Sequence, residues 1–186
     1  MALGLGADVT IIDKDLTRLS ALDALYGPRT KTLYSSPVNI EESISHSDLV
    51  IGSILIPGKT ASKLITREMI KKMSPGSVLV DVAIDQGGCS ETSKPTTHAE
   101  PTYIVEGVIH YCVTNMPGAC ARTSTQALTN ATADYALMIA NKGWKKASID
   151  NIGIRHGLNV CYGHVTNESV AYDLGYSYVP AERLLT

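Results

Sequence analysis

Residues able to exchange protons follow two apolar runs in the middle of the chain. The run over 77–84 ends at Asp85, which two glycines follow closely, and the run over 108–113 leads to Asn115 and a Pro-Gly pair. When buried parallel strands end in polar residues, those residues meet at the carboxyl edge of the sheet, where ligands bind. A carboxylate there can orient water or share a proton with an imidazole. The alternative interpretation is two ordinary strand ends with turn glycines.

An earlier apolar run, 8–13, also ends in an acid, Asp13. At the end of the second strand of a dinucleotide-binding sheet, a carboxylate accepts hydrogen bonds from both ribose hydroxyls and repels a 2′-phosphate. Asp13 therefore favours NAD over NADP, although Lys14 and Arg18 weaken this preference because cations can accept a 2′-phosphate. The alternative role for Asp13 is to cap the helix that starts near Leu16.

The elements that must position these residues alternate between strand and helix patterns. Besides the three runs above, we expect strands over 30–33 and 48–55, and helices that begin near Leu16, at an Asn39 N-cap and at Thr66. Such alternation is typical of an α/β protein with a doubly wound parallel sheet. Residues 1–120 are therefore predicted to form a Rossmann-type nucleotide-binding domain.

The pattern changes after Pro117. An apolar stripe at helical spacing precedes Gly143, and a shorter helix is expected over 167–174, with no strand of comparable strength after it. We therefore place a boundary near 119–124. Residues 121–186 are predicted to form a helical segment that packs on another part of the protein.

The composition indicates an ordinary globular protein and argues against several functional classes. Hydrophobic residues make up 44% and charged residues 18%, with a net charge of -2, so no basic excess points to nucleic acid. No apolar run reaches the ~18 residues of a membrane span, and the N-terminus lacks the pattern of a signal peptide, so we expect a cytoplasmic protein. The four cysteines form no C-x-x-C pair, which argues against a metal site and for reduced thiols.

Four strings of the sequence carry a dense resemblance to one family. They are VDVAIDQGGC at 80–89, SKPTTHAEPTY at 93–103, HYCVTNMPGACARTSTQALTNAT at 110–132 and IANKGW at 139–144. The chain resembles the C-terminal half of bacterial alanine dehydrogenase from about residue 1 to residue 176. That resemblance implies NAD-dependent oxidative deamination of L-alanine to pyruvate and ammonium. It also implies kinship with the nucleotide-binding subunit of proton-translocating transhydrogenase.

The resemblance also implies roles for individual residues. Asp85 matches an aspartate that reaches the substrate pocket and supports proton transfer during imine formation and hydrolysis, which makes it the candidate catalytic residue. The implied cofactor-binding set is Asp13 at the ribose, Ser35 near the adenine, Ile54 and Leu55 around the adenine and ribose, and Val82, Asn115 and Met116 around the nicotinamide. From the residues alone, Ser35 is a turn residue, Ile54 and Leu55 are core residues, and Asp85 is a turn or N-cap aspartate.

Two parts of the family's enzyme have no counterpart in the sequence. In the usual strand order 3-2-1-4-5-6, the strands that end at Asp13 and Leu55 read as strands two and four, so strand one and its glycine loop belong between them. Gly4-Leu5-Gly6 does not supply that loop, because it follows a helix and opens a strand. The family's N-terminal substrate domain, with its substrate-binding arginine and lysine and its catalytic histidine, is also without counterpart.

We therefore expect an N-terminally truncated sequence, or one half of a split protein, that is inactive and unstable alone and is rescued by the missing half. His98 is a poor substitute for the missing histidine, because proximity in a loop sets no geometry. A completed enzyme would act on a small molecule, with no nucleic-acid or membrane partner, and would be a homo-oligomer, since family members are often hexamers. The rival functions are the NAD-binding subunit of a transhydrogenase and a non-catalytic remnant or interaction module.

Overall fold

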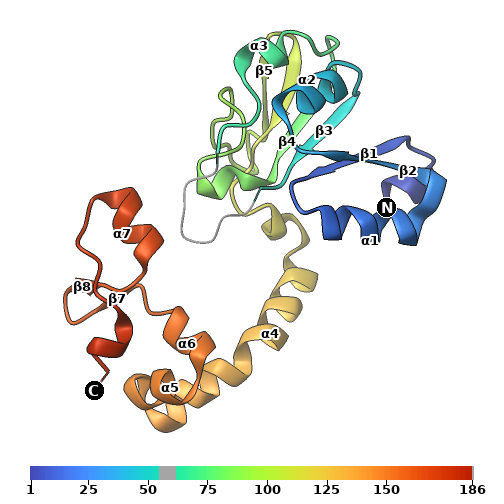
Figure 1. Cartoon of the computed structure of the whole chain (residues 1–186). Coiled ribbons are helices and arrows are strands. Elements are labelled where there is room, and N and C mark those ends of the chain that lie inside the picture. The colour runs from blue at the N-terminus through green and yellow to red at the C-terminus, as the bar shows by residue number, and fades with distance from the viewer. Residues whose placement is uncertain (55–61, 186) are drawn as a thin grey trace. The chain divides into compact units, whose positions relative to one another are not determined.

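The computed structural model of the chain describes residues 1–54 and 62–185 (Figure 1). The chain separates into two compact units. The first unit contains residues 1–54 and 62–114, and the second unit begins at Asn115. The first unit holds the parallel strands, and the second unit is mainly helical.

The first unit begins with a β-α-β segment that matches the predicted pattern. The short 3-10 helix η1 (Ala2–Leu5) ends at Gly6, whose left-handed φ of 84° closes the turn. Strands β1 (Val9–Asp13) and β2 (Thr30–Tyr34) pair in parallel, with α1 (Leu16–Tyr26) and the 3-10 turn η2 (Gly27–Arg29) between them. Figure 1 shows α1 running beside these two strands.

A second sheet in the first unit has four strands in the order β3-β4-β6-β5. Strands β3 (Leu49–Gly52), β4 (Val78–Asp81) and β6 (Val108–Tyr111) are parallel, as the sequence predicts. Strand β5 (Thr102–Val105) was not predicted, and it pairs antiparallel with β6. The two residues between them, Glu106 and Gly107, both have positive φ, as a tight two-residue hairpin turn requires.

The helices of the first unit begin at side-chain caps. Helix α2 (Pro37–Ser45) is capped by Ser36, whose Oγ accepts the Asn39 amide at 3.2 Å. The predicted Asn39 cap is therefore wrong by one turn: Pro37 suits the first helical position, and Asn39 Nδ2 instead donates to the Tyr34 carbonyl. Helix α3 (Arg67–Ile70) begins where the sequence predicts a helix, and Thr66 is its cap.

The core of the first unit lies against β4 and β6. Leu79, Val108 and Val113 are fully buried there, and so is Ile70 on α3. By contrast, no residue of β1 is buried. Among the described residues, β1 pairs only with β2 and β3 pairs only with β4, so each of these strands has one edge without a partner strand. In the usual Rossmann order 3-2-1-4-5-6, β2 and β1 take the places of strands three and two, and β3, β4 and β6 take those of strands four, five and six.

The second unit is built on a long helix. After the 3-10 turn η4 (Met116–Cys120), α4 (Ala121–Lys142) ends at Gly143, as predicted, and none of its residues is buried. Helices α5 (Trp144–Asp150) and α6 (Ile152–His156) and the small hairpin β7 (Val160–Cys161) and β8 (His164–Val165) follow, and none of the four was predicted. Helix α7 (Glu168–Leu174), capped by Asn167, agrees with the prediction, and the 3-10 turn η5 (Ala181–Arg183) comes last.

The uneven burial in the first unit predicts uneven resistance to local opening. In native-state hydrogen exchange of the chain, backbone amides of β1 and β2 should exchange at least about tenfold faster than those of β4 and β6, equivalent to about 1.4 kcal/mol of opening free energy. The reason is that β4 and β6 contain the fully buried Leu79 and Val108, whereas β1 contains no buried residue. Equal protection of both strand pairs would contradict this expectation.

Candidate active site

The candidate active site of the first unit lies at the carboxyl end of β4. The prediction that this strand runs on to Ile84 is wrong: β4 ends at Asp81, and residues Val82–Gln86 form the 3-10 turn η3. Asp81 ends the strand because its Oδ1 accepts the Ala83 amide at 3.1 Å and so caps the turn. Asp85 therefore lies one turn beyond the strand end, on the surface of η3.

Asp81 is the buried anchor of the loop that follows. Its side chain has no exposed surface. Besides the bond to Ala83, its Oδ2 accepts the amide of Cys89 at 2.8 Å and the hydroxyl of Ser93. One carboxylate therefore binds the start, the middle and the end of the loop over 82–93.

Glycines make this close packing feasible. Gly87 and Gly88 both have left-handed φ values, 90° and 79°. A Cβ on Gly88 would lie 2.7 Å from Asp81 Oδ2, and a Cβ on Gly52 would lie 2.2 Å from Cys89 Sγ. Lys63 Nζ also donates to the carbonyls of Gly87 and Gly88. The backbone of the loop is thus fixed from both sides.

The loop presents the side chains of Val82, Asp85 and Glu91 to solvent, but Glu91 Oε2 already accepts the Arg67 amide at 2.8 Å. Val82 is 47% exposed, and Asp85 is exposed. An exposed carboxylate on a fixed turn can accept or return a proton at a ligand held beside it. Cys89 cannot act as a nucleophile here, because burial, reinforced by the negative charge of Asp81, raises the pKa of its thiol to about 12.

A buried polar network supports the loop from β6. His110 is fully buried, its Nδ1 donates to the Val108 carbonyl at 3.0 Å, and its Nε2 accepts the Thr92 hydroxyl at 2.7 Å. Thr92 Oγ1 also lies 2.9 Å from Ser90 Oγ, and the Tyr103 ring stacks on the imidazole at 5.1 Å between centroids. Burial lowers the pKa of His110, so the imidazole is neutral. Because it has no exposed surface and both ring nitrogens are hydrogen-bonded within the fold, it is a structural group and not a general base.

A second predicted site residue, Asp13, lies at the carboxyl end of β1. Its Oδ1 accepts the Asp15 amide at 3.0 Å, and its carbonyl accepts the Ser35 amide at 2.9 Å. The structure therefore brings Asp13 and Ser35 together at adjacent strand ends. The alternative in which Asp13 caps α1 is wrong, because Asp15 is the cap and accepts the amides of Thr17 and Arg18.

The other predicted site residues are more scattered. Ile54 follows the end of β3 and is half-buried, whereas Leu55 lies outside the described residues. Asn115 and Met116 belong to the second unit. There Asn115 adopts a left-handed φ of 54° and precedes η4, and its carbonyl accepts the Gly118 amide at 2.9 Å. His98 is exposed.

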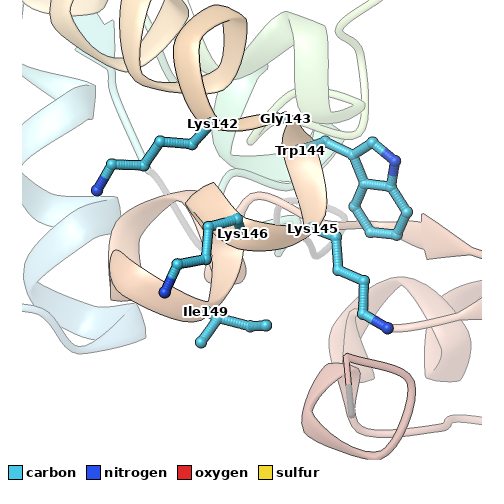
Figure 2. Close-up of a pocket in the computed structure, with 6 residues that line it drawn as sticks. All are labelled: Lys142, Gly143, Trp144, Lys145, Lys146 and Ile149. Atoms are coloured by element: carbon cyan, nitrogen blue, oxygen red, sulfur yellow. The ribbon is translucent and has the colours of Figure 1, made fainter.

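The second unit has an open hollow where α4 meets α5 (Figure 2). Lys142 and Lys146 extend to one side of it, while Trp144 and Lys145 extend to another. Asp150 accepts hydrogen bonds from Lys142 at 2.8 Å and from Lys146 at 2.7 Å, and these contacts lower the pKa of its carboxyl group. Two of the three lysines that line the hollow, Lys142 and Lys146, are therefore already paired with Asp150 within the unit.

The residues present fit the two ends of a dinucleotide. The Asp13 carboxylate, half-buried at a strand end, suits a ribose, and the exposed apolar side chain of Val82 beside Asp85 suits the face of a flat ring. Within 1–54 and 62–185, no group of three or more His, Cys, Asp or Glu side chains could hold a metal ion. No helix in the same residues is long and apolar enough to cross a membrane.

The strand order, the acids at strand ends and the glycine-bearing loop define the first unit as a Rossmann-type α/β domain. A family model described as alanine dehydrogenase/PNT, C-terminal domain, matches residues 1–168. The chain therefore belongs to the alanine dehydrogenase/PNT family.

Individual relatives agree with this assignment. The whole chain aligns at 60% identity with alanine dehydrogenases of Halomonas elongata and Bacillus subtilis, of which it covers 50% and 49%. A solved L-alanine dehydrogenase matches 94% of this chain and 48% of its own length, with a TM-score of 0.81 and 46% identity. A transhydrogenase from Sinorhizobium meliloti matches 75% of this chain and 41% of its own length, with a TM-score of 0.64 and 29% identity. The chain spans about half the length of the relatives it matches.

Sequence reasoning missed the residues that hold the site together. No role was predicted for Asp81, Lys63, Thr92 or His110. The available signal was the pair of acids four positions apart, followed by two glycines. Such a pattern allows one acid to remain inside and cap the turn while the other faces solvent.

His110 makes the stability of the chain depend on pH. Because its pKa is lowered in the folded state, the unfolded chain binds this proton more readily, so acid favours unfolding. The free energy of unfolding should fall as the pH drops below about 6.5, by up to about 1.4 kcal/mol per pH unit, until the folded pKa is reached. Urea unfolding between about pH 5.5 and 7.5 measures this slope.

The substitution His110→Gln should flatten this slope, even if it lowers the stability at every pH. The matched control is His98→Gln, which changes an exposed histidine and should keep the wild-type slope. Parallel slopes for the wild type and His110→Gln would show that another group carries the dependence.

Proposed function

We propose that this chain is the cofactor-binding half of an NAD-dependent alanine dehydrogenase. The enzyme would convert L-alanine, NAD and water into pyruvate, ammonium and NADH. The proposal rests on the residues at the strand ends of the first unit. Asp13 and Ser35 lie together at the ends of β1 and β2, and Val82 and Asp85 lie on the turn that follows Asp81 at the end of β4. The 60% identity to two alanine dehydrogenases over the whole chain supports the choice of reaction.

Asp85 is the residue we assign to proton transfer. Its carboxylate is exposed on η3, while the backbone of the turn is fixed by the cap from Asp81. A carboxylate in this position can hold the water that attacks the substrate carbon and can take up one of its protons. Bound NAD would accept the hydride from the α-carbon of alanine. The exposed side chain of Val82 would pack against the nicotinamide ring.

Asp13 is the residue we assign to cofactor choice. Its carboxylate accepts one backbone amide and retains acceptor capacity for ribose hydroxyls. The hydroxyls are donors to this carboxylate, whereas a 2′-phosphate would place like charges together. Ser35, whose amide donates to the Asp13 carbonyl, is proposed to lie near the adenine of the bound cofactor. Ile54, Leu55, Asn115 and Met116 complete the proposed cofactor-binding set.

The second unit is proposed to pack on a substrate domain that the relatives carry in their other half. Helix α4 has no buried residue, and Leu128 and Tyr135, which a spacing of seven residues places on one face of the helix, are 66% and 46% exposed. Apolar surface of this kind on a helix generally marks an interface. The same half is proposed to supply the strand between β1 and β3, the glycine loop for the phosphates, and the remaining catalytic groups. Oligomer formation, to a hexamer, is proposed for the completed enzyme.

The alternative is the NAD-binding subunit of a proton-translocating transhydrogenase. The match to a transhydrogenase structure, at 29% identity and a TM-score of 0.64, gives it some support. The matches to alanine dehydrogenases are stronger in both identity and coverage. A further alternative, a remnant without catalytic function, predicts that no added half restores activity.

The test is to complete the enzyme and measure the reaction. The chain should be purified alone and after co-expression with the N-terminal half of the Bacillus subtilis relative, extended through its glycine loop. NADH formation from L-alanine should be absent for the chain alone and present for the pair, because only the pair has both halves of the site. In the pair, Asp85→Asn should lower kcat by about 10²–10⁴-fold with little change in NAD affinity.

The control for this substitution is Asp23→Asn, which removes the same charge from an exposed position on α1 and should leave kcat unchanged. Activity of the chain alone would refute the proposed need for a second half. A pair that forms but oxidises no alanine would refute the alanine dehydrogenase reaction. NADH-dependent reduction of an NADP analogue by the pair with a transhydrogenase partner would favour the alternative. Near-normal turnover by Asp85→Asn would remove its catalytic assignment.

Asp13 should determine the preference for NAD in the same completed enzyme. Asp13→Ala should weaken NAD binding by at most roughly 2–4 kcal/mol, the value of two hydrogen bonds to a charged acceptor. NADP binding should weaken less, since the carboxylate opposes a 2′-phosphate. Dissociation constants for both dinucleotides, measured by calorimetry, report the change, with Asp23→Ala as the control. An unchanged ratio of NAD to NADP affinity would disprove the ribose role.

A further inference from the structure

The loop over 82–93 starts and ends on the same side chain. Asp81 Oδ1 accepts the Ala83 amide, and Oδ2 accepts the Cys89 amide and the Ser93 hydroxyl. These contacts span sequence separations of 2, 8 and 12 residues. We propose that Asp81 is a positioning residue that keeps this loop closed and thereby fixes Val82 and Asp85 at the edge of the sheet. The catalytic consequence rests on the proposed function, whereas the closure of the loop does not.

The chemistry of the three contacts explains why an aspartate is needed. Asp81 is fully buried, and its negative charge is balanced by N–H and O–H donors: in the described parts of the chain, no lysine or arginine forms an ion pair with it. A buried carboxylate is tolerated when its acceptor sites are filled by donors. An asparagine would place an N–H₂ donor against one of these donors, and an alanine would leave all three unpaired.

The end of the loop at Cys89 is tightly packed in the closed arrangement. The thiol of Cys89 occupies the space beside Gly52, where a Cβ would lie 2.2 Å from Sγ, and Cys89 is only 1% exposed. The Cys89 carbonyl accepts the amides of Leu64 and Ile65 at 2.9 and 3.1 Å. The far end of the loop is thus tied to the bridge at Ile65, and Lys63 binds the carbonyls of Gly87 and Gly88. The start of η3 is held by the cap from Asp81.

This arrangement makes the Cys89 thiol a reporter of loop closure. While the loop is closed, the thiol is shielded and protonated, and alkylating reagents react only with an exposed thiolate. Cys112 is an internal control for the fold as a whole, since it is also fully buried but follows β6. Cys120 is exposed and sets the rate of an accessible thiol.

The experiment measures iodoacetamide modification of each cysteine by mass spectrometry in the full 186-residue chain. Wild-type Cys89 should react far more slowly than Cys120. Asp81→Asn should speed alkylation of Cys89 by at least about tenfold, equivalent to about 1.4 kcal/mol, while Cys112 keeps its wild-type rate. Asp23→Asn, which removes an exposed charge on α1, should change neither rate.

Three results would overturn the proposal. The first is that wild-type Cys89 is alkylated as fast as Cys120. The second is that Asp81→Asn leaves the alkylation rate of Cys89 unchanged. The third is that the milder variant Ser93→Ala changes the alkylation rates of Cys89 and Cys112 equally. Ser93→Ala removes one of the three donors and decides the case if Asp81→Asn unfolds the chain. A selective rise at Cys89 in Ser93→Ala then supports the proposal, and no rise opposes it.

The consequence for catalysis is tested in the completed enzyme. Ser93→Ala and Asp81→Asn should lower kcat at least about tenfold through displacement of Asp85, whereas the preference for NAD over NADP, assigned to Asp13, should not change. If the wild-type pair oxidises no alanine, the proposed function fails, but the alkylation rates still decide the closure of the loop. If the pair is active and both variants keep normal kcat, Asp81 does not position the site.

Discussion

The satisfaction of one buried carboxylate determines the local structure of the whole candidate site. Asp81 has no exposed surface, and its two oxygens accept donors from three positions in the following loop. Burying such a charge is unfavourable unless its hydrogen bonds are complete. The chain therefore cannot continue as a strand past Asp81 without leaving those oxygens unsatisfied. The 3-10 turn, the two left-handed glycines and the burial of Cys89 all follow from this requirement.

The two sheets of the first unit differ in how self-sufficient they are. The four-stranded sheet buries residues on both β4 and β6, and its antiparallel edge is closed by a tight hairpin. The pair of β1 and β2 carries Asp13 and Ser35 but has little core of its own. Val82 and Asp85 thus follow a well-buried strand, whereas Asp13 and Ser35 lie at the ends of strands with fewer buried residues.

Apolar runs bounded by glycine or proline predicted most strands and long helices correctly, because the spacing of apolar residues and the turn residues at the ends are local signals. The end of β4 was missed because Val82, Ala83 and Ile84 continue the apolar run, and hydrophobicity does not separate a strand from a buried 3-10 turn. Besides the cap from Ala83, two of the three contacts to Asp81 come from Cys89 and Ser93, which lie 8 and 12 residues away. Local sequence patterns carry no record of such contacts. Strand β5 was missed because it follows a polar, proline-containing segment.

The hairpin of β5 and β6 also bears on the order in which the sheet can form. Its strands are joined by only Glu106 and Gly107, so closing it restricts far less chain than closing any parallel pair of the first unit, each of which needs a crossover. Contacts between near neighbours in sequence form with the smallest loss of chain entropy. Strand β6 then offers β4 a preformed edge. The buried aspartate that shapes the site is thereby added to the part of the sheet that is easiest to nucleate.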